Sequence, residues 1–112
     1  MKLKTSKINI LGMIYTIVED NAFANSKLIN NYAYIECYEK KIIYRPVVKD
    51  IETYNKLDEH QKKILRHEII HAFFHESGLT DYYRDEVLVD YLAIQFAKIG
   101  KAFEELGVEE KL

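Results

Sequence analysis

The sequence predicts one α+β domain, in which a small antiparallel sheet from the first half of the chain packs on two helices from the second half. Three observations support this fold class. The first half contains runs rich in isoleucine, valine, threonine and tyrosine, which favour strands. Residues 51–76 contain neither proline nor glycine, which favours a long helix. The length of 112 residues suits a single domain, so we expect residues 1–112 to form one unit.

The expected strands alternate with polar segments. Residues 20–31 are rich in asparagine and should form a loop, and the charged residues 38–41 suit a hairpin turn. Gly12 indicates a bulge or a close backbone approach within the first strand region, and Pro46 should end the last strand because it cannot donate to a ladder. The expected strand regions are residues 7–18, 32–37 and 42–45.

Two helices should follow. The first should cover residues 51–76, with Asp50 or Asp58 as its N-cap and Ser77-Gly78 as its stop signal. The second should run over residues 85–99, which are apolar on most sides of a helix. Gly100 is a candidate break before a last short helical segment.

Charge and cysteine content exclude several classes of protein. The formal net charge is −2 with both signs interspersed, so we expect no nucleic-acid partner. No apolar stretch approaches the ~20 residues that cross a bilayer, so we expect no membrane span. The single cysteine, Cys37, cannot form an internal disulfide or a thiolate zinc site, and it is best explained as a small core residue.

The first residues have the outline of a signal peptide, because lysines precede an apolar run and the small residues Ala22 and Ala24 follow it. Glu19 and Asp20 lie just before the supposed cleavage site, and residues 14–18 alternate as a strand does. We therefore expect a cytoplasmic protein.

The motif that carries chemistry is His67-Glu68-Ile69-Ile70-His71. Residues four apart lie on one face of a helix, so the two imidazoles can bind one zinc ion. Glu68 is then placed to act as general base, accepting a proton from the water that attacks a carbonyl. The alternative is a buried hydrogen-bonded cluster without metal. His75 continues the same row, but it lies about 12 Å along the axis from His67, too far to share the ion.

A catalytic zinc site needs a third protein ligand, and we expect Glu86, 15 residues beyond His71 at the start of the second helix. Its alternative role is to stabilise that helix N-terminus. Asp90 lies one turn later and should accept the free ring N–H of one histidine, fixing its tautomer. Asp85 could do the same for the other histidine. The expected cofactor is one zinc ion per chain.

These residues resemble the gluzincin pattern, a zinc-binding helix followed by a second helix with a glutamate ligand and an aspartate one turn later. The chain also resembles small metallopeptidases of phages and mobile elements and, more distantly, the ImmA/IrrE family. The resemblance covers residues 67–99 and implies a minimal zincin-like fold with Glu68 as general base. Asp90 departs from the ImmA/IrrE pattern, which often has asparagine there, so repressor cleavage is not carried over.

The function we expect is a zinc-dependent metallopeptidase that hydrolyses a protein or peptide substrate. A strand edge in residues 7–18 or 42–45 could hold an extended peptide, and Tyr82, Tyr83 or Arg84 could stabilise the oxyanion. The main alternative is a noncatalytic, zinc-stabilised module of phage or mobile-element origin that binds a protein partner. A third is a metal-free regulatory fold.

Overall fold

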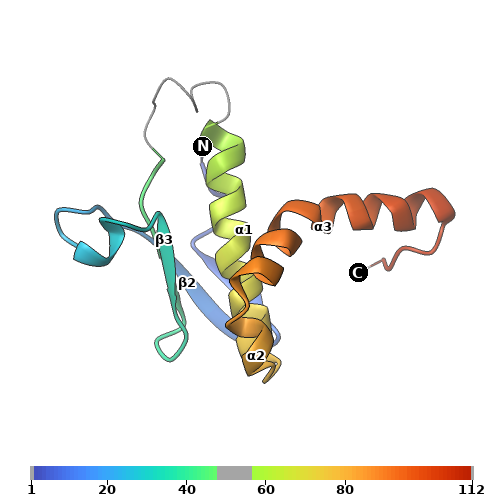
Figure 1. Cartoon of the computed structure of the whole chain (residues 1–112), viewed down its shortest axis with the longest axis horizontal. Helices are drawn as coiled ribbons and strands as arrows, with labels where there is room; N and C mark the ends of the chain where they lie inside the picture. Colours follow the sequence, from blue (N-terminus) through green and yellow to red (C-terminus); the bar gives the residue numbers. More distant parts are fainter. Residues whose placement is uncertain (1, 48–56, 112) are drawn as a thin grey trace.

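The structure is a computed structural model that describes residues 2–47 and 57–111. Its strands and helices follow the expected order, strands first and helices second, and the α+β fold class is confirmed. Figure 1 shows α1 beside the sheet and α3 crossing α1. The elements are β1 (Lys7–Ile10), β2 (Met13–Glu19), the short 3-10 helix η1 (Ser26–Leu28), β3 (Ala33–Glu36), β4 (Lys41–Tyr44), α1 (Leu57–Glu76), α2 (Thr80–Tyr83) and α3 (Glu86–Leu106).

The sheet is mixed, so the expectation of a purely antiparallel sheet was wrong. Its strand order is β1-β2-β4-β3, and β2 pairs with β4 in parallel, with Thr16 opposite Lys41 and Val18 opposite Ile43. The β1–β2 and β3–β4 pairs are antiparallel hairpins. Hairpins form between neighbours in the sequence, whereas the parallel pair joins strands separated by the loop and by β3. The two edges of the sheet are therefore β1 and β3.

Gly12 serves a turn and not the expected bulge. The strand region at residues 7–18 is divided into β1 and β2 by the two-residue turn Leu11-Gly12, where both residues have positive φ, +51° and +91°. This is the signature of a type I′ hairpin turn, whose twist matches that of the flanking strands. The backbone N–H of Gly12 donates to Oδ1 of Asn9, which closes the turn.

The core lies between the sheet and α1. Its buried members come from both layers, and α1 contacts β1, β3 and β4 on one side and α3 on the other. Helix α1 therefore packs against the sheet on one side and against α3 on the other. The buried core cluster consists of Ile10, Tyr15, Ile42, Tyr44, Leu65 and Ala72.

Both long helices end at glycines with positive φ. Gly78 (φ +74°) follows α1, and the N–H of Leu79 donates to the carbonyl of Phe74, which confirms the predicted stop. Of the two expected N-caps, Asp50 lies outside the described residues, and Asp58 lies within the first turn of α1 and not at its N-cap. Gly100 does not break α3, which continues to Leu106 and ends at Gly107. A glycine inside a helix costs about 1 kcal/mol relative to alanine, which is too little by itself to end a long helix.

Among residues 2–47 and 57–111, no helix has the length and apolar character that crossing a bilayer requires.

A polar network joins the end of α1 to the sheet. The Glu76 carboxylate accepts a 2.5 Å hydrogen bond from the Tyr15 hydroxyl and a 2.6 Å ion pair from Lys40. Lys40, helped by Tyr15, holds the pKa of Glu76 below its ordinary value. Burial and the nearby Glu76 carboxylate raise the pKa of Tyr15. These contacts hold the C-terminal end of α1 against the sheet. They therefore help to set where the other side chains of α1 lie relative to the strands.

We expect Glu76→Gln to destabilise the protein in a pH-dependent way. A carboxylate whose folded pKa is depressed stabilises the fold above its unfolded pKa, about 4.3, and loses that contribution as the pH falls through the lower folded value. The variant should lose about 1–2 kcal/mol of unfolding free energy at pH 7 and progressively less as the pH falls below about 4, measured by urea titration. Glu39→Gln, whose carboxylate is exposed beside Lys41, is the control. A difference that does not depend on pH would contradict the charge assignment.

Candidate metal centre

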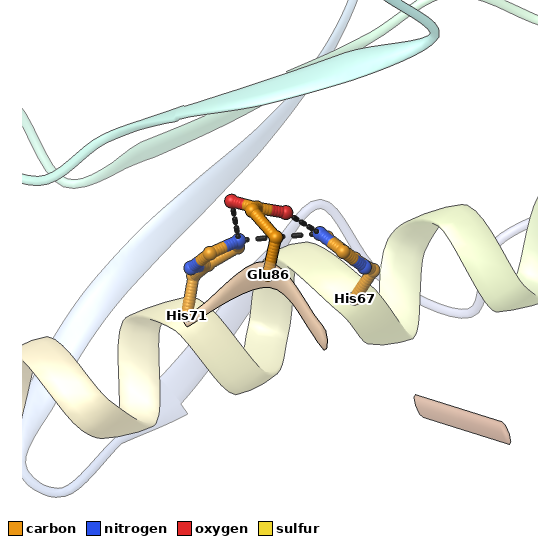
Figure 2. Close-up of side chains that lie close together, drawn as sticks. All are labelled: His67, His71 and Glu86. Carbon is orange, nitrogen blue, oxygen red and sulfur yellow. Dashed lines mark hydrogen bonds and ion pairs between the residues drawn. The ribbon is translucent and has the colours of Figure 1, made fainter. Parts of the chain in front are cut away.

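Three side chains from two helices converge on one point. His67 and His71 lie one turn apart on α1, and their Nε2 atoms are 3.2 Å apart. Glu86, the first residue of α3, places Oε2 at 2.9 Å from Nε2 of His67 and Oε1 at 3.0 Å from Nε2 of His71. Figure 2 shows the carboxylate lying across the gap between the two rings. The structure thus brings together the three residues that the sequence predicted as ligands.

Local structure explains why the start of α3 lies over α1. The chain turns at Gly78, forms the single turn of α2 and then begins α3 at Asp85. The Asp85 carboxylate caps the helix by accepting the N–H of Leu88 at 3.0 Å. Further along, Nε of Arg66 donates to the Ala93 carbonyl at 2.9 Å and holds α3 against α1. The backbone of Glu86 is therefore held by the Asp85 cap on one side and by the Arg66–Ala93 hydrogen bond on the other.

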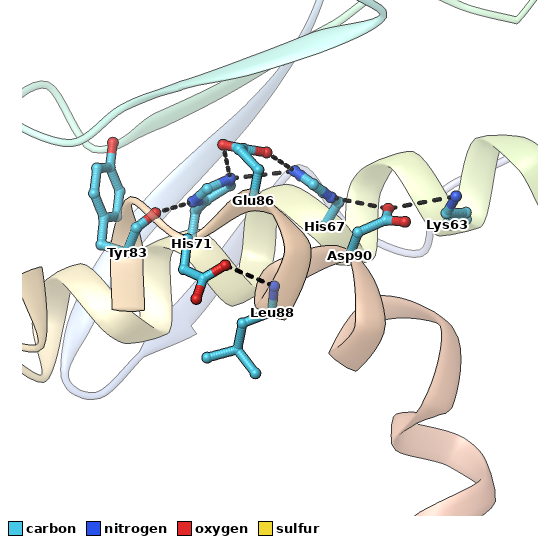
Figure 3. Close-up of polar contacts among 8 residues, drawn as sticks. Lys63, His67, His71, Tyr83, Glu86, Leu88 and Asp90 are labelled. Carbon is cyan, nitrogen blue, oxygen red and sulfur yellow. Dashed lines mark hydrogen bonds and ion pairs between the residues drawn. The ribbon is translucent and has the colours of Figure 1, made fainter. Parts of the chain in front are cut away.

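The outer ring nitrogens set the tautomer of each histidine. Nδ1 of His71 lies 2.8 Å from the carbonyl oxygen of Tyr83, and Nδ1 of His67 lies 3.4 Å from Oδ1 of Asp90 (Figure 3). The Tyr83 carbonyl can only accept, so Nδ1 of His71 carries the proton. The 3.4 Å contact between His67 and Asp90 is an ion-pair distance and not a hydrogen bond, but the carboxylate favours a proton on Nδ1 of His67 as well. Burial lowers the pKa of His71, which favours its neutral ring. In the neutral tautomers both Nε2 atoms hold a lone pair directed at the shared point.

This donor set fits a bound cation. Two imidazole lone pairs and a carboxylate all accept, so they repel one another unless a positive charge lies between them. A tetrahedral zinc ion, with ligand bonds of about 2.0–2.2 Å, separates its ligand atoms by roughly 3.3–3.6 Å. The observed contacts of 2.9–3.2 Å, which reach the two histidines from different oxygens of Glu86, are somewhat shorter, and one ligand atom from each residue lies within 4.8 Å of the others. Protons shared among the three groups are the alternative source of positive charge.

The fourth side of the cluster is open. The side chain of Glu86 is 68% exposed, whereas that of His71 is 7% exposed. The residues that the structure describes offer this point three ligands, His67, His71 and Glu86. Two histidines, one carboxylate and an accessible fourth position are the arrangement of catalytic zinc sites, in contrast to structural sites, which are closed by protein.

Glu68 is buried beside the cluster. Its pKa is raised to about 7, chiefly by desolvation; His67 opposes the shift and Glu86 adds to it. A cation held by the neighbouring ligands would lower this pKa again. A carboxyl group that titrates near neutrality can both accept and return a proton, which is what a general base requires.

A groove runs between the cluster and the edge strand β3. Two hollows, with volumes of about 260 and 520 Å³, share the lining residues Asn31, Ala33, His67 and Glu68. The smaller hollow extends towards His60 and Lys63, and the larger extends towards Tyr83 and Arg84. Glu68 therefore faces a cleft whose opposite wall is a strand edge.

The two aspartates differ in their placement. Asp90 lies beside His67, as expected, and its Oδ1 also lies 3.4 Å from Nζ of Lys63. Asp85 does not orient a histidine, so that expectation was wrong: its carboxylate caps α3, and the position beside His71 is taken by the Tyr83 carbonyl. A short acidic side chain just before a helix bonds its own backbone readily, which competes with any longer-range role.

Sequence reasoning missed two members of the site. The Tyr83 carbonyl gave no signal, because every residue has one and only the fold decides where it points. Lys63 did give a signal, since it lies four residues before His67 and hence on the same face of α1. His75 lies outside the cluster, where its ring contacts those of Tyr38 and Tyr83.

Comparisons of the chain with models of protein families, with curated proteins and with solved structures give no significant match. The case for the site therefore depends on its residues and their geometry.

We expect the purified chain to bind about one zinc ion and Glu86→Ala to bind less, because the variant keeps two ligands of three. Elemental analysis of protein prepared without metal-affinity resin checks this. Glu104→Ala, an exposed glutamate on the same helix, is the matched control and should keep its zinc. A native chain that takes up no zinc even when zinc is added would contradict the ligand assignment.

The two aspartates should respond differently to substitution. Asp90→Ala removes the acceptor that faces Nδ1 of His67, so zinc affinity should fall about 10- to 100-fold. Asp85→Ser keeps a capping side chain, so zinc affinity should stay within about threefold of the native value. Competition with a chromophoric chelator measures both. Equal losses in the two variants would contradict the separate roles.

Proposed function

We propose that this chain is a zinc-dependent metallopeptidase that hydrolyses a protein or peptide substrate. The observation that carries the proposal is the placement of the buried Glu68 side chain next to three convergent ligands and facing a groove. A purely structural metal site has no need of such a group.

His67, His71 and Glu86 would hold the ion. When bound, zinc supplies Lewis-acid chemistry, polarising a carbonyl group and acidifying water. The Glu68 carboxylate takes the proton of the attacking water and returns it to the nitrogen of the leaving amine. Asp90 and the Tyr83 carbonyl keep the two imidazoles in the tautomers that leave Nε2 free.

An extended peptide suits the groove. Strand β3 is an edge of the sheet, and its residues Ala33, Tyr34 and Ile35 line the hollow that also contains Glu68 and His71. A substrate that adds to this edge as a further strand would pass its backbone in front of the cluster. Of the regions expected to supply a strand edge, residues 42–45 lie in the central strand β4, whereas residues 7–18 include the edge strand β1, which is the edge farther from β3.

Arg84 is our choice for stabilising the developing oxyanion. Of the three neighbouring candidates, Tyr83 has its hydroxyl engaged by the Cys37 thiol at 3.4 Å, and the Tyr82 ring packs at 5.8 Å from that of Phe74. Arg84 lines the same hollow as Glu68 and Glu86 and brings a fixed positive charge. We place the activity in the cytoplasm, where the free thiol of Cys37 stays reduced.

Glu68→Gln should abolish peptide hydrolysis and keep the zinc. The amide cannot accept the proton of the attacking water, so the rate should fall about 10²- to 10⁴-fold. Cleavage of a quenched fluorescent peptide library measures the rate, and elemental analysis measures the metal. Glu59→Gln, an exposed glutamate of α1, is the control. A Glu68→Gln variant that holds zinc and cleaves at the native rate would contradict the mechanism.

A further inference from the structure

The segment that joins α1 to the first turn of α3 depends on one side chain for its packing. Within residues 77–87, Tyr83 is half-buried and every other residue is exposed. A segment with so few buried contacts is held weakly unless one of its side chains is anchored. The same segment supplies two parts of the candidate metal centre, the Tyr83 carbonyl and the ligand Glu86. The contacts of Tyr83 therefore bear directly on the geometry of the centre.

The Tyr83 side chain contacts both layers of the fold. Its ring centroid lies 5.2 Å from that of His71 and 5.7 Å from that of His75, one turn later on α1. Its hydroxyl accepts a hydrogen bond at 3.4 Å from the thiol of Cys37, the first residue after β3. Tyr83 is thus held by α1 on one side and by the turn between β3 and β4 on the other.

The backbone carbonyl of Tyr83 is available to His71 because of its place in α2. Tyr83 is the last residue of this short helix, and the last carbonyls of a helix have no partner within it. The carbonyl of Tyr82 accepts the N–H of Asp85, whereas that of Tyr83 accepts Nδ1–H of His71 at 2.8 Å (Figure 3). Side chain and carbonyl belong to one residue, so whatever anchors the ring also holds this acceptor opposite His71.

We propose that Tyr83 is a positioning residue of the metal centre, whose side chain, held by Cys37 and the rings of α1, fixes the carbonyl that orients His71. Glu86 follows only three residues later, so a shift of Tyr83 would displace this ligand as well. A misplacement of about 1 Å in a catalytic site can cost up to 100-fold in rate. This role deepens the proposed function, on which its catalytic meaning rests.

Tyr82 provides a matched control in the same turn of helix. Its ring packs 5.8 Å from that of Phe74, and the residue is 50% exposed. Tyr82→Ala and Tyr83→Ala each remove one tyrosine ring from α2, so a general loosening of α2 would affect His71 in both variants. A positioning role of Tyr83 affects His71 in the second variant alone.

Long-range ¹H–¹⁵N spectra of the zinc-free histidine rings test the orientation of His71 without substrate or metal. At about pH 8 an ordinary histidine is neutral, and its tautomer follows the hydrogen bonds that it makes. The native chain and Tyr82→Ala should show His71 protonated on Nδ1. In Tyr83→Ala the displaced carbonyl no longer competes with the Glu86 carboxylate, 3.0 Å from Nε2, so a population protonated on Nε2 should appear. His67, whose Nδ1 faces Asp90, should not change.

Zinc affinity tests the link to the sheet. Tyr83→Ala should weaken zinc binding about 10- to 100-fold, and Tyr82→Ala should stay within about threefold of the native value. Tyr83→Phe and Cys37→Ala remove the two partners of one weak hydrogen bond, so each should cost about two- to fivefold. The variant that carries both changes should lose no more than either alone, because the contact can be lost only once.

Three results would overturn the proposal: a His71 ring that stays protonated on Nδ1 in Tyr83→Ala, an equal disturbance in Tyr82→Ala, or losses from Tyr83→Phe and Cys37→Ala that add. Tyr83→Leu, which also removes the ring and hydroxyl but fills part of their space, replaces Tyr83→Ala if that variant does not fold. A native chain that binds no zinc would contradict the proposed function, whereas the tautomer of His71 would still decide the role of Tyr83.

Discussion

The convergence of three electron-pair donors on one point is the constraint on which the rest of the structure depends. Nε2 of His67, Nε2 of His71 and the Glu86 carboxylate lie within hydrogen-bonding distance of one another, although each is an acceptor in the tautomers that their outer partners select. That arrangement is stable only around a positive charge. The capped start of α3, the turn at Gly78 and the Tyr83 carbonyl all serve to bring Glu86 and His71 to this point.

Helix α1 joins the site to the fold. Leu65 and Ala72 belong to the core cluster, while His67 and His71 on the same helix belong to the candidate metal centre. The Tyr15–Glu76–Lys40 network then ties the end of α1 to β2 and to the turn between β3 and β4. Burying Glu68 and His71 costs stability unless partners compensate for the lost hydration. Such local conflicts between burial and polarity are typical of functional sites.

Much of the site was predictable because its signal is local. The spacing of His67 and His71 fixes their shared face on any helix, and Asp90 follows Glu86 by one turn of α3. What the sequence did not predict depends on distant pairing or on the backbone. The parallel β2–β4 pair requires strands that are not neighbours in the chain, and the Tyr83 carbonyl has no side-chain signature. For Asp85, capping and histidine orientation need the same carboxylate, so only its observed bond to Leu88 decides between them.

The most direct test of the central claim is a long-range ¹H–¹⁵N correlation spectrum of the histidine rings, recorded as zinc is added. The chain has four histidines, and His60 and His75 lie outside the cluster and serve as internal controls. We expect the Nε2 signals of His67 and His71 to shift with one equivalent of zinc, while each Nδ1 keeps its proton and the other two rings stay unchanged. Zinc that shifts His60 or His75 instead, or that binds through Nδ1, would contradict the site as described.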